Sequence, residues 1–266
     1  MRVIDWADFI SGKAPPDDFP GDQPLSLSIG VFDGVHRGHQ ELIRRITAES
    51  PAATVITFRQ NPRQVLSPEK HQGDIFSLKQ KLAVLESLGV SRAVLIDFSG
   101  NFSRLTGRDF IGLLKKSCRI GYMALGVNFR CGHRLDTGAR SIRTWMMEDG
   151  LTADLVEPVM EGRHPVSSSR IRSLVSAGDL AAAAALMGRA LRIDLSGMAV
   201  SDGGEGRCYD AASVSRITPR PGSYRVLVRG AGAGRETTVF IKDRKIFIPA
   251  KTGDPVFGVE DIEFIS

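Results

Sequence analysis

Two histidines follow a predicted strand near the start of the chain. Residues 28–39 read Ser-Ile-Gly-Val-Phe-Asp-Gly-Val-His-Arg-Gly-His, which places His36 and His39 one helical turn apart. Gly34 and Gly38 allow the backbone to approach a ligand closely. The first N–H groups of a helix attract anions, and two imidazoles there can donate hydrogen bonds to phosphoryl oxygens as negative charge develops. The spacing therefore points to phosphate chemistry.

Other interpretations of these residues remain open at this point. Taken alone, His36 at a helix start is typical of a surface or capping residue. Two histidines three positions apart can also bind zinc, but no carboxylate or cysteine with suitable spacing lies nearby, so we predict no metal ligands. Asp33 either caps the turn or helix or contacts a ligand, and the sequence does not separate these roles.

A second group of hydroxyls and a guanidinium begins a later helix. Ser167, Ser168, Ser169 and Arg172 lie within Val-Ser-Ser-Ser-Arg-Ile-Arg, residues 166–172. This combination predicts a second phosphate-binding site at a helix N-terminus. The alternative is a serine N-cap followed by surface arginines.

Alternating strands and helices must position these residues. We predict strands at residues 25–32, 53–58, 93–98 and 121–126, and helices at residues 38–50, 77–88 and 109–116. Alternation of this kind predicts an α/β fold with a doubly wound, mostly parallel, Rossmann-like sheet. Asn128 follows the last of these strands, where it could cap a turn.

The last third of the chain has a different pattern. Two short helices are predicted at residues 171–176 and 179–186, and no helical pattern follows residue 197. Short β-branched runs at residues 224–228, 237–241, 245–248 and 257–264 are separated by Gly- and Pro-rich turns, which predicts a small β-barrel-like domain. We therefore expect two domains, residues 1–190 and 191–266.

Composition limits the class of protein. The chain has 266 residues, 42% hydrophobic and 24% charged, as in globular proteins. Three cysteines argue against a disulfide framework, and no apolar stretch is long enough to cross a membrane, so we expect a cytoplasmic protein without a membrane partner. The net charge of +5 is scattered and only 7% of residues are aromatic, which favours anionic small molecules over nucleic acid. The oligomeric state is not predicted.

Residues 28–39 resemble the opening signature of the bacterial flavin adenylyltransferases, the amino-terminal module of bifunctional riboflavin kinase/FAD synthetases. Further segments resemble that family in order, at residues 57–62, 97–111, 126–132, 166–172 and 186–189, and the resemblance extends over residues 22–191. The sequence departs from the family pattern at three positions: Asn61 stands where His is usual, Cys131 replaces an aromatic residue, and Ser169 stands for Thr. We expect Cys131 to be a small packing residue rather than a reactive thiol.

The resemblance implies an FMN adenylyltransferase that uses ATP, FMN and Mg²⁺. An oxygen of the FMN phosphate would attack the α-phosphorus of ATP directly, and pyrophosphate would leave. The resemblance implies catalytic roles for His36, His39, Asn128 and Arg172, and substrate-binding roles for Gly30, Phe32, Asp33, Gly34, Ser167, Ser168 and Ser169.

The carboxy-terminal part departs from the family. The kinase module carries Gly-Arg-x-x-Gly-x-Pro-Thr-x-Asn and a later catalytic Glu, whereas Gly206-Arg207 here continues as Cys-Tyr-Asp-Ala-Ala. We therefore expect adenylyltransferase activity without riboflavin kinase activity. The alternatives are a bifunctional enzyme with a diverged kinase site, a non-catalytic flavin or nucleotide sensor, and a nucleotidyltransferase for another acceptor.

Overall fold

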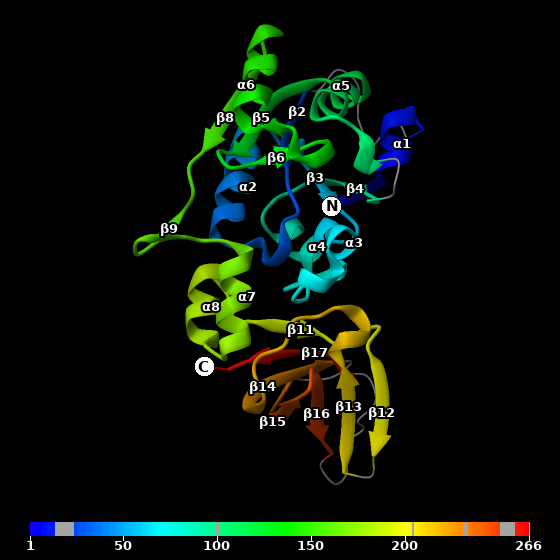
Figure 1. Cartoon of the computed structure of the whole chain (residues 1–266), viewed down its shortest axis with the longest axis vertical. Coiled ribbons are helices and arrows are strands. Elements are labelled where there is room, and N and C mark those ends of the chain that lie inside the picture. Colours follow the sequence, from blue (N-terminus) through cyan, green and yellow to red (C-terminus); the bar gives the residue numbers. More distant parts are fainter. Residues whose placement is uncertain (14–23, 99–101, 204, 231–233, 251–258, 266) are drawn as a thin grey trace. The chain divides into compact units, whose positions relative to one another are not determined.

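The computed structural model describes residues 1–13, 24–98, 102–203, 205–230, 234–250 and 259–265. These residues form two compact units (Figure 1). The first comprises Met1–Pro68 and Leu82–Pro165, and the second comprises Glu69–Lys81 and Val166–Ser266. Each unit is described by itself below.

The first unit contains a six-stranded parallel sheet with the strand order β1-β4-β3-β2-β5-β8. The strands are β1 (Arg2–Asp5), β2 (Leu25–Ile29), β3 (Ala53–Phe58), β4 (Arg92–Ile96), β5 (Ile120–Gly126) and β8 (Thr152–Val156). This arrangement confirms the predicted doubly wound parallel sheet. The sequence pattern did not predict β1 or β8, which occupy the two edges of the sheet.

Helices cover both faces of this sheet (Figure 1). The helices that precede β8 in sequence are α1 (Trp6–Ser11), α2 (Arg37–Glu49), the short α3 (Pro62–Leu66), α4 (Leu78–Ser87), α5 (Gly107–Ser117) and α6 (Ala139–Glu148), of which α4 begins in the second unit and ends in the first. Alternate residues of β2 face opposite sides: Leu25, Leu27 and Ile29 join the core formed with α1, α5 and α6, whereas the Ser26 hydroxyl donates to the carbonyl of Ile46 in α2, at 2.6 Å. The strand order reverses between β2 and β5, because β3 and β4 extend to one side of β2 and β5 to the other.

Two short hairpins complete the first unit. One pairs β6 (Arg130–Cys131) with β7 (Thr137–Gly138), and the other pairs β9 (Met160–Glu161) with β10 (His164–Pro165). The β6–β7 hairpin follows the carboxyl end of β5 and carries a single turn of 3-10 helix, His133–Leu135.

The second unit combines two helices with an antiparallel sheet. Helix α7 (Ser168–Ala177) and helix α8 (Leu180–Met187) each end at a glycine with positive φ, Gly178 and Gly188. The seven-stranded sheet curls into a half-barrel (Figure 1), in the order β11-β17-β14-β15-β16-β13-β12. Its strands are β11 (Arg192–Asp194), β12 (Ala199–Gly203), β13 (Gly206–Asp210), β14 (Gly222–Gly230), β15 (Arg235–Lys242), β16 (Lys245–Pro249) and β17 (Val259–Phe264).

This sheet confirms the predicted small β-barrel-like region. The sequence pattern did not predict β11, β12 or β13. The predicted run at residues 257–264 corresponds to β17, and residues 257 and 258 lie outside the described residues.

Residues Glu69–Lys81 belong to the second unit although they lie between β3 and β4 of the first unit in sequence. The Asp74 N–H donates to the Ser215 carbonyl at 2.7 Å, and the Ile217 N–H donates to the Asp74 carbonyl at 3.1 Å. Gly73 has φ +107°, and a Cβ at this position would lie 2.7 Å from the Ile217 nitrogen. A glycine is therefore required for this close approach.

Candidate active site

The loop that carries the predicted histidines runs from the carboxyl end of β2 into α2 and has a strained backbone. Phe32, Gly34 and Val35 have φ values of 53°, 74° and 35°. Positive φ is uncommon for a phenylalanine and is an outlier for a β-branched valine. The Gln40 side chain supports this conformation by donating to the Val35 carbonyl at 2.9 Å. Backbone strain of this kind persists mainly where the surrounding structure enforces it, often at functional sites.

His36 and His39 lie against each other at the beginning of α2. Their rings are stacked, with centroids 3.6 Å apart and planes inclined by 16°. His36 is the N-cap of α2, and its Nδ1 accepts a hydrogen bond from the His39 N–H at 3.3 Å. A backbone N–H can only donate, so Nδ1 carries a lone pair and the neutral ring is protonated at Nε2. The capping role and a role as phosphate donor are therefore compatible, because they use different ring nitrogens.

The residues between β2 and α2 pack around Phe32. Its ring is buried and meets the edge of the His39 ring, with centroids 5.2 Å apart. A Cβ at Gly30 would lie 3.3 Å from the Phe32 ring, so the absence of a side chain at Gly30 leaves room for this ring. Asp33 is buried in the 3-10 turn Asp33–Val35. It is not the N-cap of α2, because His36 occupies that position.

Asn128 lies at the carboxyl end of the neighbouring strand β5. The turn that contains it is closed by the Phe129 N–H, which donates to the Gly126 carbonyl at 2.8 Å. Parallel sheets bind ligands outside the carboxyl ends of the strands where the strand order reverses. In this sheet that point lies between β2 and β5, and the histidine loop and Asn128 follow these two strands.

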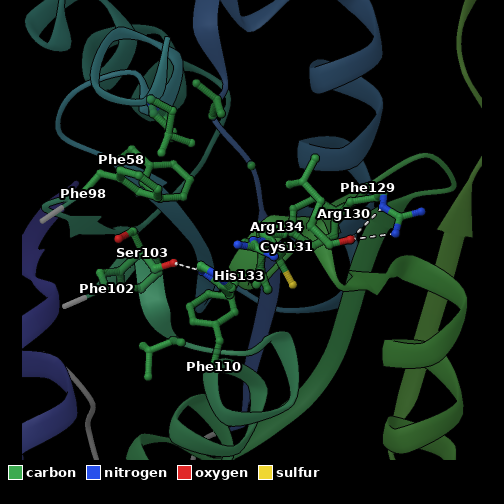
Figure 2. A pocket seen from close by; sticks show the side chains of 18 of the residues that line it. Phe58, Phe98, Phe102, Ser103, Phe110, Phe129, Arg130, Cys131, His133 and Arg134 are labelled. Atoms are coloured by element: carbon green, nitrogen blue, oxygen red, sulfur yellow. Dashed lines mark hydrogen bonds between the residues drawn. The ribbon is translucent and has the colours of Figure 1, made fainter. Parts of the chain in front are cut away.

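A cavity of about 550 Å³ lies at this edge of the first unit (Figure 2). Gly30, Val31 and Asn128 line it at the strand ends. Aromatic rings form much of its wall, contributed by Phe58, Phe98, Phe102, Phe110 and Phe129. The Phe102 ring meets Phe58, Phe98 and Phe110 edge to face, with centroids 5.6–6.0 Å apart. Such a wall suits a flat, largely apolar ring system.

Asn128 was predicted from the sequence to belong to a site, but these phenylalanines were not. The sequence feature that could have indicated them was the spacing of Phe98, Phe102 and Phe110. These residues lie in separate elements, and their rings come together only in the fold. Pro62 and Leu66 of α3 also line the cavity. Asn61 is the N-cap of this short helix and accepts from the Arg63 N–H at 3.1 Å.

Cys131 lines the same cavity. Burial, with a smaller contribution from the charge of Asp136, raises the pKa of this thiol from 9.0 to about 12. A thiol with so high a pKa is protonated at neutral pH and is a poor nucleophile. This agrees with the expected packing role.

The predicted second phosphate-binding motif begins α7 in the second unit. Ser167 is the N-cap of this helix and accepts from the Arg170 N–H at 3.3 Å. Ser168 is half-buried and Ser169 is exposed. Arg172 is buried, and its Nε donates to the Gly73 carbonyl at 2.8 Å. The guanidinium therefore attaches α7 to the segment Glu69–Lys81.

Within the part of the chain that the structure describes, no group of three or more His, Cys, Asp or Glu side chains could hold a metal ion. Among the same residues, no helix has the length and apolar character needed to cross a membrane.

Comparison with known proteins decides the family. A profile of the FAD synthetase family matches residues 19–170. The chain belongs to this family. A bifunctional riboflavin kinase/FMN adenylyltransferase of Escherichia coli (strain K12) is 31% identical over 216 residues, covering 77% of this chain and 68% of the relative. A Bacillus subtilis (strain 168) relative of the same description is 28% identical over 211 residues, covering 75% of this chain and 66% of the relative.

The resemblance inferred from the motifs is thus confirmed, and membership of the FAD synthetase family makes the chain a nucleotidyltransferase. A crystal structure described as a macrolide-efflux protein from Streptococcus pneumoniae has the same fold. Its TM-score is 0.79 at 21% identity, covering 99% of this chain and 98% of that one.

Proposed function

We propose that this member of the FAD synthetase family is an FMN adenylyltransferase, which forms FAD and pyrophosphate from FMN and ATP. The observation that carries the proposal is the aromatic cavity at the carboxyl ends of β2 and β5 in a chain of this family. The isoalloxazine ring of FMN is flat and largely apolar, whereas its phosphate is anionic. The phenylalanine wall suits the ring, and the start of α2 suits phosphate.

In the proposed reaction, an oxygen of the FMN phosphate forms a bond to the α-phosphorus of ATP. The bond from the α-phosphorus to the oxygen bridging to the β-phosphorus breaks, and its electron pair leaves with pyrophosphate. No covalent enzyme intermediate is needed, so positioning and neutralisation of charge provide the catalysis. His36 can donate from Nε2 to the phosphoryl oxygens, because its Nδ1 is held by the His39 N–H.

We propose that His39 acts on the same phosphates, that Gly30, Phe32, Asp33 and Gly34 shape the nucleotide site, and that Asn128 contacts FMN. We assign binding of the β- and γ-phosphates to Ser167, Ser168, Ser169 and Arg172. The hydroxyls at the start of α7 support this assignment, although Ser167 also caps the helix and Arg172 also binds the Gly73 carbonyl. We place the adenylyltransferase domain at residues 1–190 and the β domain at residues 191–266.

We propose Mg²⁺ as the cofactor. Mg²⁺ in nucleotide sites is held largely by phosphates and water, with few protein carboxylates. The described residues fit that pattern, since they contain no cluster of three potential ligands. When bound to the triphosphate, Mg²⁺ would neutralise charge on the departing pyrophosphate.

We further propose that the chain lacks riboflavin kinase activity. Where the kinase motif would continue towards Pro-Thr-x-Asn, residues Gly206–Asp210 form strand β13, hydrogen-bonded to β12 on one side and β16 on the other. Arg207 forms an ion pair with Asp202 at 2.7 Å. Gly204 of the same motif lies outside the described residues. A paired strand with this side-chain pairing supports a structural role for the segment.

The test is a paired assay of the purified protein with ATP and Mg²⁺, with FMN in one reaction and riboflavin in the other, and products separated by chromatography. We expect FAD from FMN and no product from riboflavin. FMN or FAD from riboflavin would show that kinase activity persists. The absence of product in both reactions would contradict the adenylyltransferase proposal and favour a flavin sensor or another acceptor.

A further inference from the structure

Polar side chains also line the cavity of the first unit away from the strand ends. Much of its surface is formed by phenylalanine, leucine and proline side chains, but His133 and Arg134 line it from the turn between β6 and β7 (Figure 2). We infer that His133 is a specificity-determining residue that accepts a hydrogen bond from N3–H of the isoalloxazine ring. This inference rests on the proposed function, because it requires a flavin in the cavity.

The contacts of His133 determine which of its ring nitrogens can meet a ligand. Its Nδ1 lies 3.0 Å from the Ser103 carbonyl oxygen. A carbonyl oxygen can only accept, so Nδ1 carries the proton and Nε2 carries the lone pair of the neutral ring. The neutral imidazole, which lines the cavity, is therefore a hydrogen-bond acceptor at Nε2. The Leu105 carbonyl accepts from the His133 N–H at 2.8 Å and fixes the backbone at the same place.

The turn that carries His133 is strained and held by several hydrogen bonds. Arg134 and Leu135 have φ values of 54° and 57°, a conformation that costs energy for residues with a side chain. The Arg130 guanidinium donates to the Leu135 carbonyl from Nε at 3.0 Å and from Nη2 at 2.6 Å. Two successive residues in this conformation indicate that the position of the turn matters beyond connecting β6 to β7.

The chemistry of FMN gives the polar side chains of this cavity a specific partner. One edge of the isoalloxazine ring presents the acceptor C2=O, the donor N3–H and the acceptor C4=O, whereas the opposite edge carries two methyl groups. Because Asn128 and the histidine loop follow the strand ends, the phosphate belongs at that end of the cavity. The phenylalanines then suit the dimethylbenzene ring. The acceptor Nε2 of His133 suits N3–H, and Arg134, which has only donors, suits the neighbouring carbonyls.

The test compares the affinities for FMN and for its N3-methyl analogue, which lacks the N3–H donor. Kd is measured by flavin fluorescence for the wild-type 266-residue chain and for its variants His133→Asn and His133→Leu. Asn retains a donor near the position of Nδ1, and hence the contact with Ser103, but has no atom at the position of Nε2. Leu retains bulk and has no acceptor, so it controls for the size of the added methyl group.

We expect the wild-type protein to bind the N3-methyl analogue about three- to tenfold more weakly than FMN, as for the loss of one hydrogen bond. Both variants should bind FMN more weakly by a similar factor and should no longer discriminate between the two flavins. Equal binding of FMN and the analogue by the wild-type protein would overturn the inference without any variant.

Unchanged discrimination in His133→Asn would also overturn the inference, because N3–H would then be recognised elsewhere. Discrimination retained by His133→Leu but lost in His133→Asn would assign the effect to size and would likewise overturn it. In these cases wild-type binding of FMN and formation of FAD would leave the proposed function intact. A wild-type protein that does not bind FMN would instead contradict the proposed function, and the inference with it.

Discussion

The two roles of His36 can be separated by substitution. Its Nδ1 caps α2 by accepting from the His39 N–H at 3.3 Å, whereas Nε2 is the nitrogen proposed to contact the phosphates. Asparagine is among the best N-cap residues, and its short side chain has no atom at the position of Nε2. His36→Asn should therefore keep the cap and lose the phosphate donor. His36→Ala should lose both.

The expected magnitudes differ enough to be measured independently. Removing an N-cap side chain costs about 0.5–2 kcal/mol of folding free energy. Removing one donor that stabilises developing charge lowers kcat by about 10²- to 10³-fold. We therefore expect a similar large loss of kcat in both variants, with FAD still bound because the donor acts mainly in the transition state. Only His36→Ala should lose about 1 kcal/mol of stability.

The assay is FAD formation from FMN and ATP under saturating substrate, together with urea unfolding of each variant. A His36→Asn variant with wild-type kcat would refute the reasoning, since the imidazole would then serve only as a cap. Equal stability of the Asn and Ala variants would refute the other half, namely the contribution of the Nδ1 hydrogen bond.

Three other outcomes follow from the geometry. Burial raises the pKa of Cys131 to about 12, so its alkylation by iodoacetamide at pH 8 should be about a thousandfold slower than expected for a thiol with a pKa of 9.0. The alkylation rate should increase about tenfold per pH unit. Rapid labelling of Cys131, measured by peptide mass spectrometry, would contradict this. Phe102→Leu should weaken FMN binding about tenfold and leave ATP binding unchanged in calorimetry, and unaltered FMN affinity would remove this ring from the site. Gly73→Ala should destabilise the protein by at least about 1–3 kcal/mol in urea unfolding, given φ +107° and a Cβ 2.7 Å from the Ile217 nitrogen; an unchanged midpoint would contradict the close approach.

Local pattern predicted most of the parallel sheet correctly. Strands such as β3 are short apolar runs bounded by breakers, and α2 has a clear apolar stripe, so their type follows from nearby residues alone. The edge strands β1 and β8 were not predicted from the sequence. Each becomes a strand by pairing with a neighbour, β1 with the distant β4 and β8 with β5, and pairing of this kind leaves little signal in the sequence.

The sequence alone determined the family and the identity of the histidine motif, because chemistry-bearing residues at a fixed spacing are local features. The folded structure decided which ring nitrogen of each histidine is bound to the backbone. For His36 the answer comes from the His39 N–H, and for His133 from the Ser103 carbonyl, 30 residues away in the chain.

Tertiary structure also assembled the aromatic cavity. Phe58 comes from β3, Phe98 follows β4, and Phe110 lies on α5, so no single segment carries the site. Phe58 and Phe98 meet because parallel strands bring their carboxyl ends to one edge of the sheet, and Phe102 contacts both of them and Phe110. The amino-acid sequence gives the residue types of a site. The distances and hydrogen bonds that determine which ligand the site binds depend on contacts between residues far apart in sequence.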